Sequence, residues 1–260
     1  MFKLGARLGL RDPRNLRFGN YIKTKRILPE IPLKIDWDSD VMDKYQMFGN
    51  DLAGNCVFVA AANQIVGSAV KTGDPCDITT GKVLREYSDV TGYDPETGAN
   101  DRGSFPEDVL RHFSKKPIGD PFRIEAWGEI DISNLEEIRA GMYLFGGIFT
   151  ALYLPITARD QIENGEVWHI NRKTAFRKRR AGSWGGHMTM TRFMNSSEKD
   201  IDIRTITWAR QQKMTEEWWR KYCAVAYFFI TEKWISDHTG KTPAGFDLET
   251  LLADVEELRK

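Results

Sequence analysis

The order of the predicted elements indicates an α+β protein whose helices and strands form separate layers. Helices are expected to dominate the first half of the chain and strands the second half, without the alternation that builds a parallel sheet. Cys56 and His187 would then belong to different lobes. The sequence therefore predicts a helical lobe facing an antiparallel β-sheet lobe, with a cleft between them that could hold a reactive pair.

The predicted helices rest on apolar spacing and on helix-start signals. Residues 56–70 form an apolar run whose alanines permit close packing, and apolar residues recur at three-to-four spacing over 82–90. Pro106 is expected to begin a short helix. The capping-box spacing that starts at Ser133 predicts a helix from 134 to about 144.

The predicted strands lie in the second half of the chain. They are apolar runs or segments with a period of two, namely 148–154, 187–193, 202–208 and 227–230. A polar surface excursion is expected over 160–180 and an aromatic-rich helix over 214–224. The glycine-rich loop 98–103 is expected to be a structural turn near the cleft, with a cation site as the alternative.

The two ends of the chain differ from the middle. Residues 1–45 are interrupted by prolines and show no sustained period, which predicts an extended N-terminal arm ahead of a domain over 46–260. Leucines and a valine recur on one face over 246–259, which predicts an amphipathic C-terminal helix. We expect this helix to dock on the body of the domain; binding to a partner is the alternative.

The composition excludes several classes of function. Lys and Arg number 37, as do Asp and Glu, so a net charge of zero steers the protein neither to nucleic acid nor to an anionic membrane. The basic run within 172–180 is expected to be a solvated loop, with contact to nucleic acid or an acidic partner as the alternative. No apolar run approaches the roughly 20 residues that span a bilayer, and no secretory signal is visible. Three cysteines fit a reducing compartment, so a cytoplasmic protein is expected.

Cys56 is the strongest candidate for chemistry. It follows the turn-prone segment 50–55 and opens the predicted helix 56–70, where the positive end of the helix dipole favours a thiolate. A thiolate nucleophile needs an imidazole to hold or return its proton. Cys76 and Cys223 have no such context and are expected to be structural. The alternative for Cys56 is a buried cysteine that only fills space.

His187 is the candidate base among the four histidines. It follows the segment Gly-Ser-Trp-Gly-Gly at 182–186 and begins a predicted strand, so a loop would deliver it to the cleft. The others, His112, His169 and His238, are expected to be structural or surface residues. No zinc pattern is present, and neither a metal nor a cofactor is expected.

These residues resemble the catalytic segments of papain-like cysteine peptidases. Asn50, Gly54 and Cys56 match a box in which that family has Gln six residues before the cysteine and Gly two before it. His187 follows Cys56 at a separation within the roughly 130–150 residues known for papain. The segment at Trp208 resembles the family's Asn-Ser-Trp-Gly segment, whose Trp shields an Asn–His pair. The whole chain also resembles a group of papain-like proteins of tailed phages and bacteria, which share its Ser-Trp-Gly-Gly-His box and its Thr-Gly-Tyr-Asp-Pro turn.

The resemblance implies three catalytic roles. Cys56 would be the nucleophile and His187 the general base and acid. Asn50 would donate its side-chain NH₂ to the oxyanion, together with the backbone N–H of Cys56. Asn50 is shorter than the family's Gln, so its reach toward the oxyanion is reduced.

The residue that orients the imidazole is where the chain departs from the family. An ungapped match puts Ile206 in place of the Asn, and Ile cannot orient an imidazole. A shift of one residue puts Thr207 there, whose hydroxyl accepts a hydrogen bond less strongly than an amide or carboxylate. Asp51 and Asp202 are the other candidates.

Two functions remain open. The first is a phage-encoded papain-like cysteine peptidase or amide hydrolase that acts on a peptide or protein in the cytoplasm of the host cell. The alternative is a catalytically weak or inactive papain-like fold that serves as a structural or binding component of a phage virion. In that case residues 1–45 would contact protein partners in the particle, and neither nucleic acid nor a membrane is expected as a partner.

Overall fold

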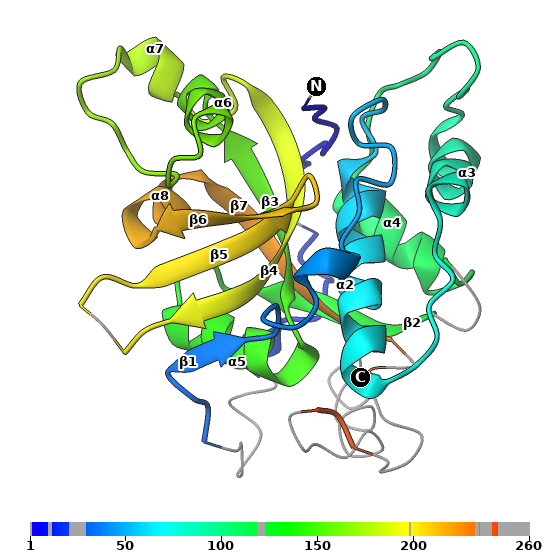
Figure 1. Cartoon of the computed structure of the whole chain (residues 1–260), viewed down its shortest axis with the longest axis horizontal. Coiled ribbons are helices and arrows are strands. Elements are labelled where there is room, and N and C mark those ends of the chain that lie inside the picture. Colours follow the sequence, from blue (N-terminus) through cyan, green and yellow to red (C-terminus); the bar gives the residue numbers. More distant parts are fainter. Residues whose placement is uncertain are drawn as a thin grey trace.

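A helical lobe lies beside an antiparallel sheet in the computed structural model (Figure 1). The structure describes residues 2–9, 12–20, 30–118, 123–197, 199–231, 234 and 241–243. The helical lobe is built from α2 (Cys56–Thr72), α3 (Thr80–Thr91) and α4 (Pro106–Phe113). The helices that accompany the sheet are α5 (Leu135–Phe145), α6 (Ile156–Glu163), α7 (Phe176–Arg179) and α8 (Glu216–Tyr222). The predicted α+β class is thereby confirmed, and the predicted helix 246–259 lies outside the described residues.

The sheet has the strand order β2-β7-β3-β4-β5-β6, and β1 pairs with β4 outside this order. Its strands are β1 (Lys34–Asp36), β2 (Ile124–Ile130), β3 (Ile148–Leu154), β4 (Gly185–Asn195), β5 (Asp202–Thr207), β6 (Arg210–Thr215) and β7 (Cys223–Thr231). Every pair is antiparallel, as predicted for the β lobe. The strand β4 lies between β3 and β5: its first residues pair with β3, as in Leu152 with His187, and its pairing with β5 begins at Met190.

The helix α2 is the buried centre of the molecule. It lies between the sheet on one side and α3 and α4 on the other, and its side chains are buried from Cys56 to Ala69 (Figure 1). The alternation along β3 separates two cores, because Phe149 and Ala151 join the core beneath α2 while Leu152 joins the core on the opposite face. The start of α2 is therefore fixed against the sheet.

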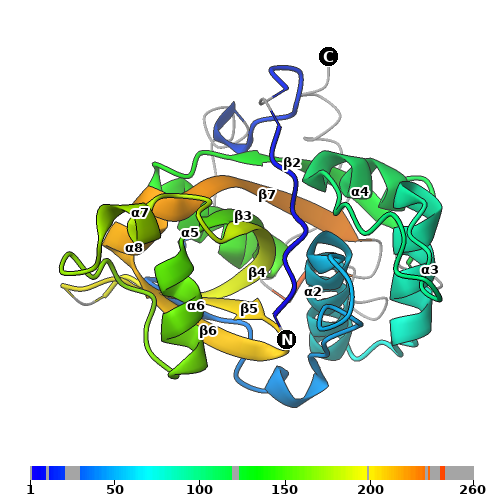
Figure 2. The same ribbon diagram turned by 90° about the horizontal axis from the view of Figure 1, so that it is seen from above.

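The N-terminal segment crosses the molecule between α2 and the sheet (Figure 2). The backbone N–H of Ala6 donates to Gly186 O of β4 (3.1 Å), and the N–H of Arg7 donates to Ser104 O of the helical lobe (2.9 Å). Further along, Arg17 pairs with Glu129 of β2. The described part of the first 17 residues thus contacts both lobes, through different residues.

The predicted helix 214–224 is wrong over its first two and last two residues. Residues up to Thr215 belong to β6, the helix is α8, and β7 begins at Cys223. The hairpin that creates β6 turns on Trp208 and Ala209, both with positive φ. Such a two-residue turn is usually signalled by Asn-Gly or Asp-Gly, and neither dipeptide stands at 208–209.

Two further local predictions need correction. The excursion 160–180 is not all surface, because Trp168 is fully buried and its indole N–H donates to Ala158 O (2.9 Å). The cap of α5 is Asn134, whose Oδ1 accepts from the backbone N–H groups of Glu136 and Glu137, in place of Ser133. In the described ranges, no helix is both long and apolar enough to span a bilayer.

Candidate active site

Cys56 is the first residue of α2 and is 1 % exposed. The loop before it is held by buried hydrogen bonds, since the Asn55 side chain donates to Phe48 O (2.9 Å) and the Gly54 N–H donates to Asp101 Oδ1 (2.7 Å). The Tyr87 hydroxyl donates to the same Asp101 oxygen (2.8 Å). The glycine-rich loop before α4 thus fixes the turn that delivers the thiol.

His187 lies near the start of β4, and its Nε2 is 2.7 Å from the hydroxyl of Thr207 on β5. Both side chains are buried. Asp51 is exposed, and Asp202 is paired with Arg204 at the far end of β5. Among the proposed orienting residues, Thr207 is therefore the one that the structure brings to the imidazole.

The hydrogen bond to Thr207 determines which imidazole nitrogen is free. If Nε2 carries the proton and donates to the hydroxyl oxygen, Nδ1 keeps its lone pair. Within the described part of the chain, Nδ1 has no hydrogen-bond partner although it is buried. A buried acceptor without a donor costs about 1–3 kcal/mol, so such a group points to a function or to a missing partner.

Trp208 covers the imidazole. Its indole stacks on His187 with ring centroids 4.2 Å apart and an interplanar angle of 13°. Trp208 and Ala209 have φ of 47° and 56°, values that are outliers for bulky residues and cost of the order of 1 kcal/mol or more each. The strained turn places an apolar ring over the His187–Thr207 bond and keeps water from it.

Burial favours the uncharged forms of both the sulfur and the imidazole. Burial raises the pKa of the Cys56 thiol to about 12, although backbone groups of Met188, Gly5, Ala6 and Val57 hydrogen-bond to the thiolate and oppose the rise. Burial alone lowers the pKa of His187 to about 3. The contact with Met188 places the sulfur beside the start of β4, one residue beyond His187.

Asn50 lies in the turn ahead of Cys56, and its side chain is engaged locally. Its Nδ2 donates to Ala53 O (3.1 Å), and the residue is 1 % exposed. One of its two amide hydrogens therefore already has an acceptor. The second hydrogen is what remains for an oxyanion.

The N-terminal segment lies over the catalytic candidates. The Lys3 backbone N–H donates to Asn50 O (3.3 Å), and Lys3 O accepts from the Trp208 indole N–H (3.3 Å). The Lys3 ammonium is 3.7 Å from Asp101. Gly5 and the residue after it contact the sulfur through their backbone. The thiol is thus covered partly by the N-terminal segment, which we call the cover segment (residues 2–9).

The arrangement of the two lobes matches solved cysteine proteases. Xylellain, a cysteine protease from Xylella fastidiosa, aligns with a TM-score of 0.58 and 12% sequence identity over 88% of this chain and 96% of its own. This protein has a papain-like fold. Digestive procathepsin L 3 of Tenebrio molitor aligns with a TM-score of 0.55 and 10% identity, over 81% of this chain and 72% of its own. ProCathepsin B S9 from Trypanosoma congolense gives 0.54 and 10%, over 88% and 87%. No family model and no curated protein sequence matches the chain.

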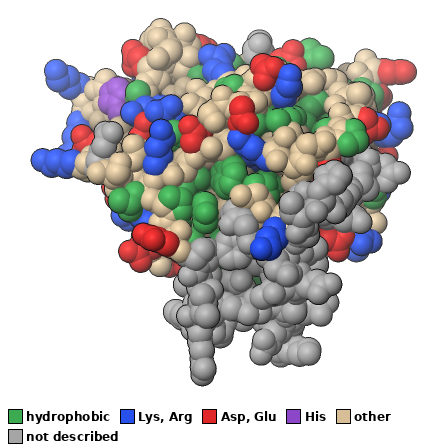
Figure 3. Space-filling view, turned by 60° about the horizontal axis from the view of Figure 1, so that its bottom comes forward, with side chains coloured by type: hydrophobic (Ala, Val, Ile, Leu, Met, Phe, Trp, Pro, Cys, Tyr) green, Lys and Arg blue, Asp and Glu red, His purple; other side chains and the backbone are tan. Residues whose placement is uncertain are grey.

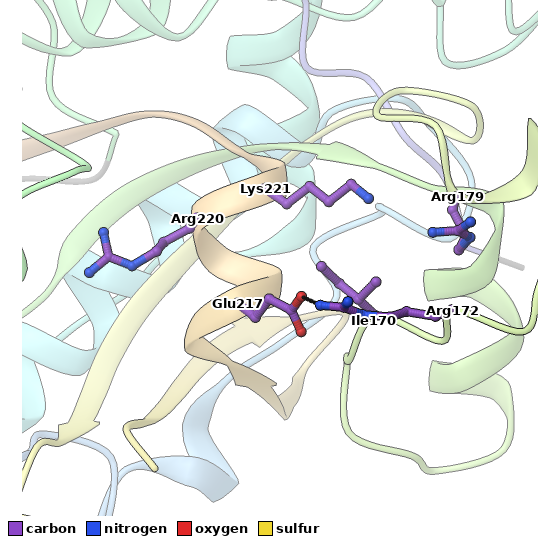
Figure 4. A pocket seen from close by; sticks show the side chains of 6 residues that line it. All are labelled: Ile170, Arg172, Arg179, Glu217, Arg220 and Lys221. Carbon is purple, nitrogen blue, oxygen red and sulfur yellow. Dashed lines mark hydrogen bonds and ion pairs between the residues drawn. The ribbon is translucent and has the colours of Figure 1, made fainter. Parts of the chain in front are cut away.

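A basic pocket of about 330 Å³ lies on the β lobe of this papain-like fold, between α8 and the second half of the excursion 160–180 (Figure 4). Its cations have partners within the chain: Arg172 pairs with Glu217 (2.5 Å), and the Arg179 Nε donates to Thr174 O (2.8 Å). The internal partners of Arg172 and Arg179 favour the solvated-loop interpretation of the basic run. On the face shown in Figure 3, basic and acidic side chains are interspersed.

The remaining histidines are placed away from the sulfur where they are described. His112 is hydrogen-bonded to Glu86 (2.6 Å) and His169 to Gln161 (3.0 Å). His238 lies outside the described residues. In the described ranges, no group of three or more His, Cys, Asp or Glu side chains could hold a metal ion. Sequence reasoning missed the cover segment, because the small residues Gly5 and Ala6 gain their meaning only from the positions of Gly54 and Gly186 in the fold.

Proposed function

We propose that this protein is a papain-like thiol hydrolase that cuts a peptide or amide bond through an acyl-enzyme at Cys56. The observation that carries the proposal is the buried His187, whose Nε2 is bonded to Thr207 while its Nδ1 has no partner in the described structure. A buried histidine with a purely structural role is expected to have a hydrogen-bond partner at each of its two nitrogens. Nδ1 with a free lone pair is what a general base requires.

The proposed reaction follows from these roles. The thiol passes its proton to His187 Nδ1, and the sulfur attacks the carbonyl carbon of the substrate to form a tetrahedral oxyanion. The backbone N–H of Cys56 and the second amide hydrogen of Asn50 donate to that oxygen. The C–N bond breaks, the imidazolium gives its proton to the leaving amine, and a thioester remains on Cys56. Water, deprotonated by His187, then hydrolyses the thioester and restores the thiol.

The cover segment gives the proposed enzyme a closed resting form. Two of the similar solved structures are pro-forms of cathepsins. We propose that residues 2–9 act as a cover that must leave before a substrate enters. Sequence reasoning alone predicts that Cys56 reacts with iodoacetamide faster than the other two thiols. In the closed chain we expect the half-buried Cys76 to react first, because Cys56 is covered.

The test uses the Gly5→Val variant to displace the cover segment. A side chain at Gly5 would begin 1.7 Å from Gly54 O, so Val cannot keep the native path. We expect Gly5→Val to hydrolyse a fluorogenic casein substrate, and Gly5→Val with Cys56→Ala to lose all turnover. Gly5→Val with Cys76→Ala is the matched thiol control and keeps its turnover. If Cys56 labels rapidly in Gly5→Val and no amide substrate is cut, the hydrolase proposal is wrong.

Two observations favour a second candidate. The site departs from the family at the orienting residue, where a threonine hydroxyl stands in for an amide, and the thiol is held protonated under the cover segment. We propose as the alternative a catalytically weak or inactive papain-like fold that serves as a structural or binding component of a phage virion and whose arm contacts neighbouring subunits. It predicts that the protein co-purifies with particles and that Cys56→Ala leaves assembly intact. Absence from purified particles would eliminate it, whereas the hydrolase proposal places the protein in the host cytoplasm.

A further inference from the structure

The cover segment passes through a slot whose walls lack side chains. Gly54 lies on the side of the helical lobe, Gly186 on the side of the sheet, and Gly103 beside the same crossing. A Cβ on Gly103 would lie 2.0 Å from Gly5 O, and one on Gly186 would lie 2.1 Å from Ala6 O. Real Cβ atoms do not approach oxygen so closely, so these walls admit the segment because they are glycine.

The restriction also applies to the chain inside the slot. A Cβ added to Gly5 would lie 1.7 Å from Gly54 O and 2.4 Å from the Gly54 carbonyl carbon. Both are backbone atoms, which cannot rotate away as a flexible side chain would. At the next residue there is room for one methyl group, because Ala6 packs into the core beneath α2.

Hydrogen bonds made by main-chain groups fix the positions of the three glycines that form the walls of the slot. The Gly54 N–H donates to Asp101 (2.7 Å), and the Gly103 N–H donates to the Tyr87 hydroxyl (3.0 Å). Gly186 is paired with β3 in the middle of the sheet lobe. Widening the slot would therefore break buried hydrogen bonds, which makes a small residue in the slot the less costly solution.

The slot recognises a peptide backbone. Gly186 O accepts from the Ala6 N–H (3.1 Å), the Ser104 N–H donates to Gly5 O (2.9 Å), and Ser104 O accepts from the Arg7 N–H (2.9 Å). Outside the slot, larger side chains find contacts, since the Arg7 guanidinium lies 4.4 Å from the centroid of the Phe105 ring. His187 follows Gly186 in the sheet-side wall, and among the described residues its buried Nδ1 has no hydrogen-bond partner, which is the independent sign that a ligand group belongs beside the slot.

We propose that the slot restricts ligands to polypeptides with glycine at the residue that lies against Gly54 and glycine or alanine next to it. The substrate class of the enzyme would then be proteins with an accessible Gly-Gly or Gly-Ala segment. The main-chain hydrogen bonds at Gly186 and Ser104 are directional, so the restriction applies to a bound chain that runs in the direction of the cover segment. The inference rests on the proposed function for its catalytic consequence, but the selectivity of binding stands independently.

The first experiment measures opening of the slot by the rate at which iodoacetamide labels Cys56 in the full chain. We expect Gly5→Val to speed labelling by at least about tenfold, because the cover segment can no longer occupy the slot. Gly9→Ala is the matched control, since its Cβ would meet only the Phe105 ring at 3.5 Å, an ordinary contact. Lys3→Glu, which reverses the charge facing Asp101, is a second opening variant should Gly5→Val fold poorly.

The second experiment measures selectivity by fluorescence anisotropy with Gly5→Val and Cys56→Ala combined, which cannot cut a peptide. The probes are labelled hexapeptides with Gly-Gly, Gly-Ala, Ala-Ala or Leu-Leu at the centre. The open variant is needed because the tethered cover segment otherwise competes at a high effective concentration. We expect Gly-Gly and Gly-Ala to bind about 100-fold more tightly than Leu-Leu, since overpacking a closed site costs about 1–3 kcal/mol.

The outcomes separate the two proposals. Equal affinity for all four peptides overturns the slot inference, whether or not the protein is an enzyme. Selective binding without hydrolysis by the variant that retains Cys56 overturns the hydrolase proposal and leaves the slot inference standing. Hydrolysis of casein together with equal hydrolysis of all four peptides overturns the slot inference and leaves the hydrolase proposal standing.

Discussion

Replacing Thr207 by valine tests the bond on which the candidate site depends. Valine has nearly the shape of threonine, so the substitution removes the hydroxyl and leaves the packing. His187 Nε2–H then loses the acceptor at 2.7 Å in a buried site. An unsatisfied buried donor costs about 1–3 kcal/mol, so we expect the free energy of unfolding to fall by about 2 kcal/mol.

The assay is urea unfolding followed by tryptophan fluorescence. At a slope of about 3 kcal/mol/M, a loss of 2 kcal/mol lowers the midpoint by about 0.7 M. Thr207→Ser keeps the hydroxyl and is the matched control, with an expected loss of less than about 1 kcal/mol for the missing methyl group. In the catalytic assay, Thr207→Val should lower kcat more than Thr207→Ser does.

A double-mutant cycle with His187→Ala isolates the bond itself. Without the imidazole, the Thr207 hydroxyl has nothing to orient, and the cost of Thr207→Val should fall below about 0.5 kcal/mol. A cost that is the same with and without His187 would refute the argument. The hydroxyl would then stabilise the protein through another contact, and Thr207 would not be the residue that holds the imidazole.

Two further predictions follow from backbone strain and from pKa. Ala209→Gly relieves a left-handed residue with φ of 56° and should raise the free energy of unfolding by about 0.5–1 kcal/mol, read as a higher Tm; a lower Tm would show that the turn is not strained. The lowered pKa of His187, about 3 against an ordinary 6.5, means that the unfolded chain binds more protons than the folded chain between these values. Stability should therefore fall as pH drops below 6.5, by about 2–3 kcal/mol at pH 4.5, and His187→Gln should flatten this part of the urea-unfolding pH profile. An unchanged profile in His187→Gln would assign the acid sensitivity to other groups.

The sequence predicted the strands and helices that bury one face or carry a start signal. The run 148–154 is apolar except for Thr150, and it forms β3 with the predicted bounds. The strand β6 was not predicted, because its sequence Arg-Gln-Gln-Lys-Met-Thr is polar and its turn at Trp208 has none of the usual turn residues. Tertiary contacts decide that hairpin, since Trp208 must cover His187.

In the candidate site, too, the sequence predicts some residues and leaves others undetermined. Cys56 was found because a helix start after a turn is visible in the sequence, and Thr207 remained one of several orienting candidates because a shift of one residue cannot be resolved without the register of β5. The cover segment could not be predicted at all. Only the depth of the slot reveals that Gly5 and Ala6 are small because Gly54 and Gly186 lie against them.

In the closed structure, burial opposes transfer of the proton from the Cys56 thiol to the His187 imidazole. Because burial raises the pKa of Cys56 and lowers that of His187, moving the proton from sulfur to imidazole costs far more free energy here than between the two groups in water. At the ordinary values of 9.0 and 6.5, the same transfer costs about 3 kcal/mol, before the helix N-terminus and the attraction between the two charges reduce it. Burial causes both shifts, whereas the backbone groups of Gly5 and Ala6 in the cover segment lower the pKa of the thiol and so favour the thiolate. Departure of residues 2–9 would therefore do two opposing things: it would remove these two hydrogen bonds and it would admit water, and formation of the thiolate–imidazolium pair requires that hydration of the cleft outweigh their loss.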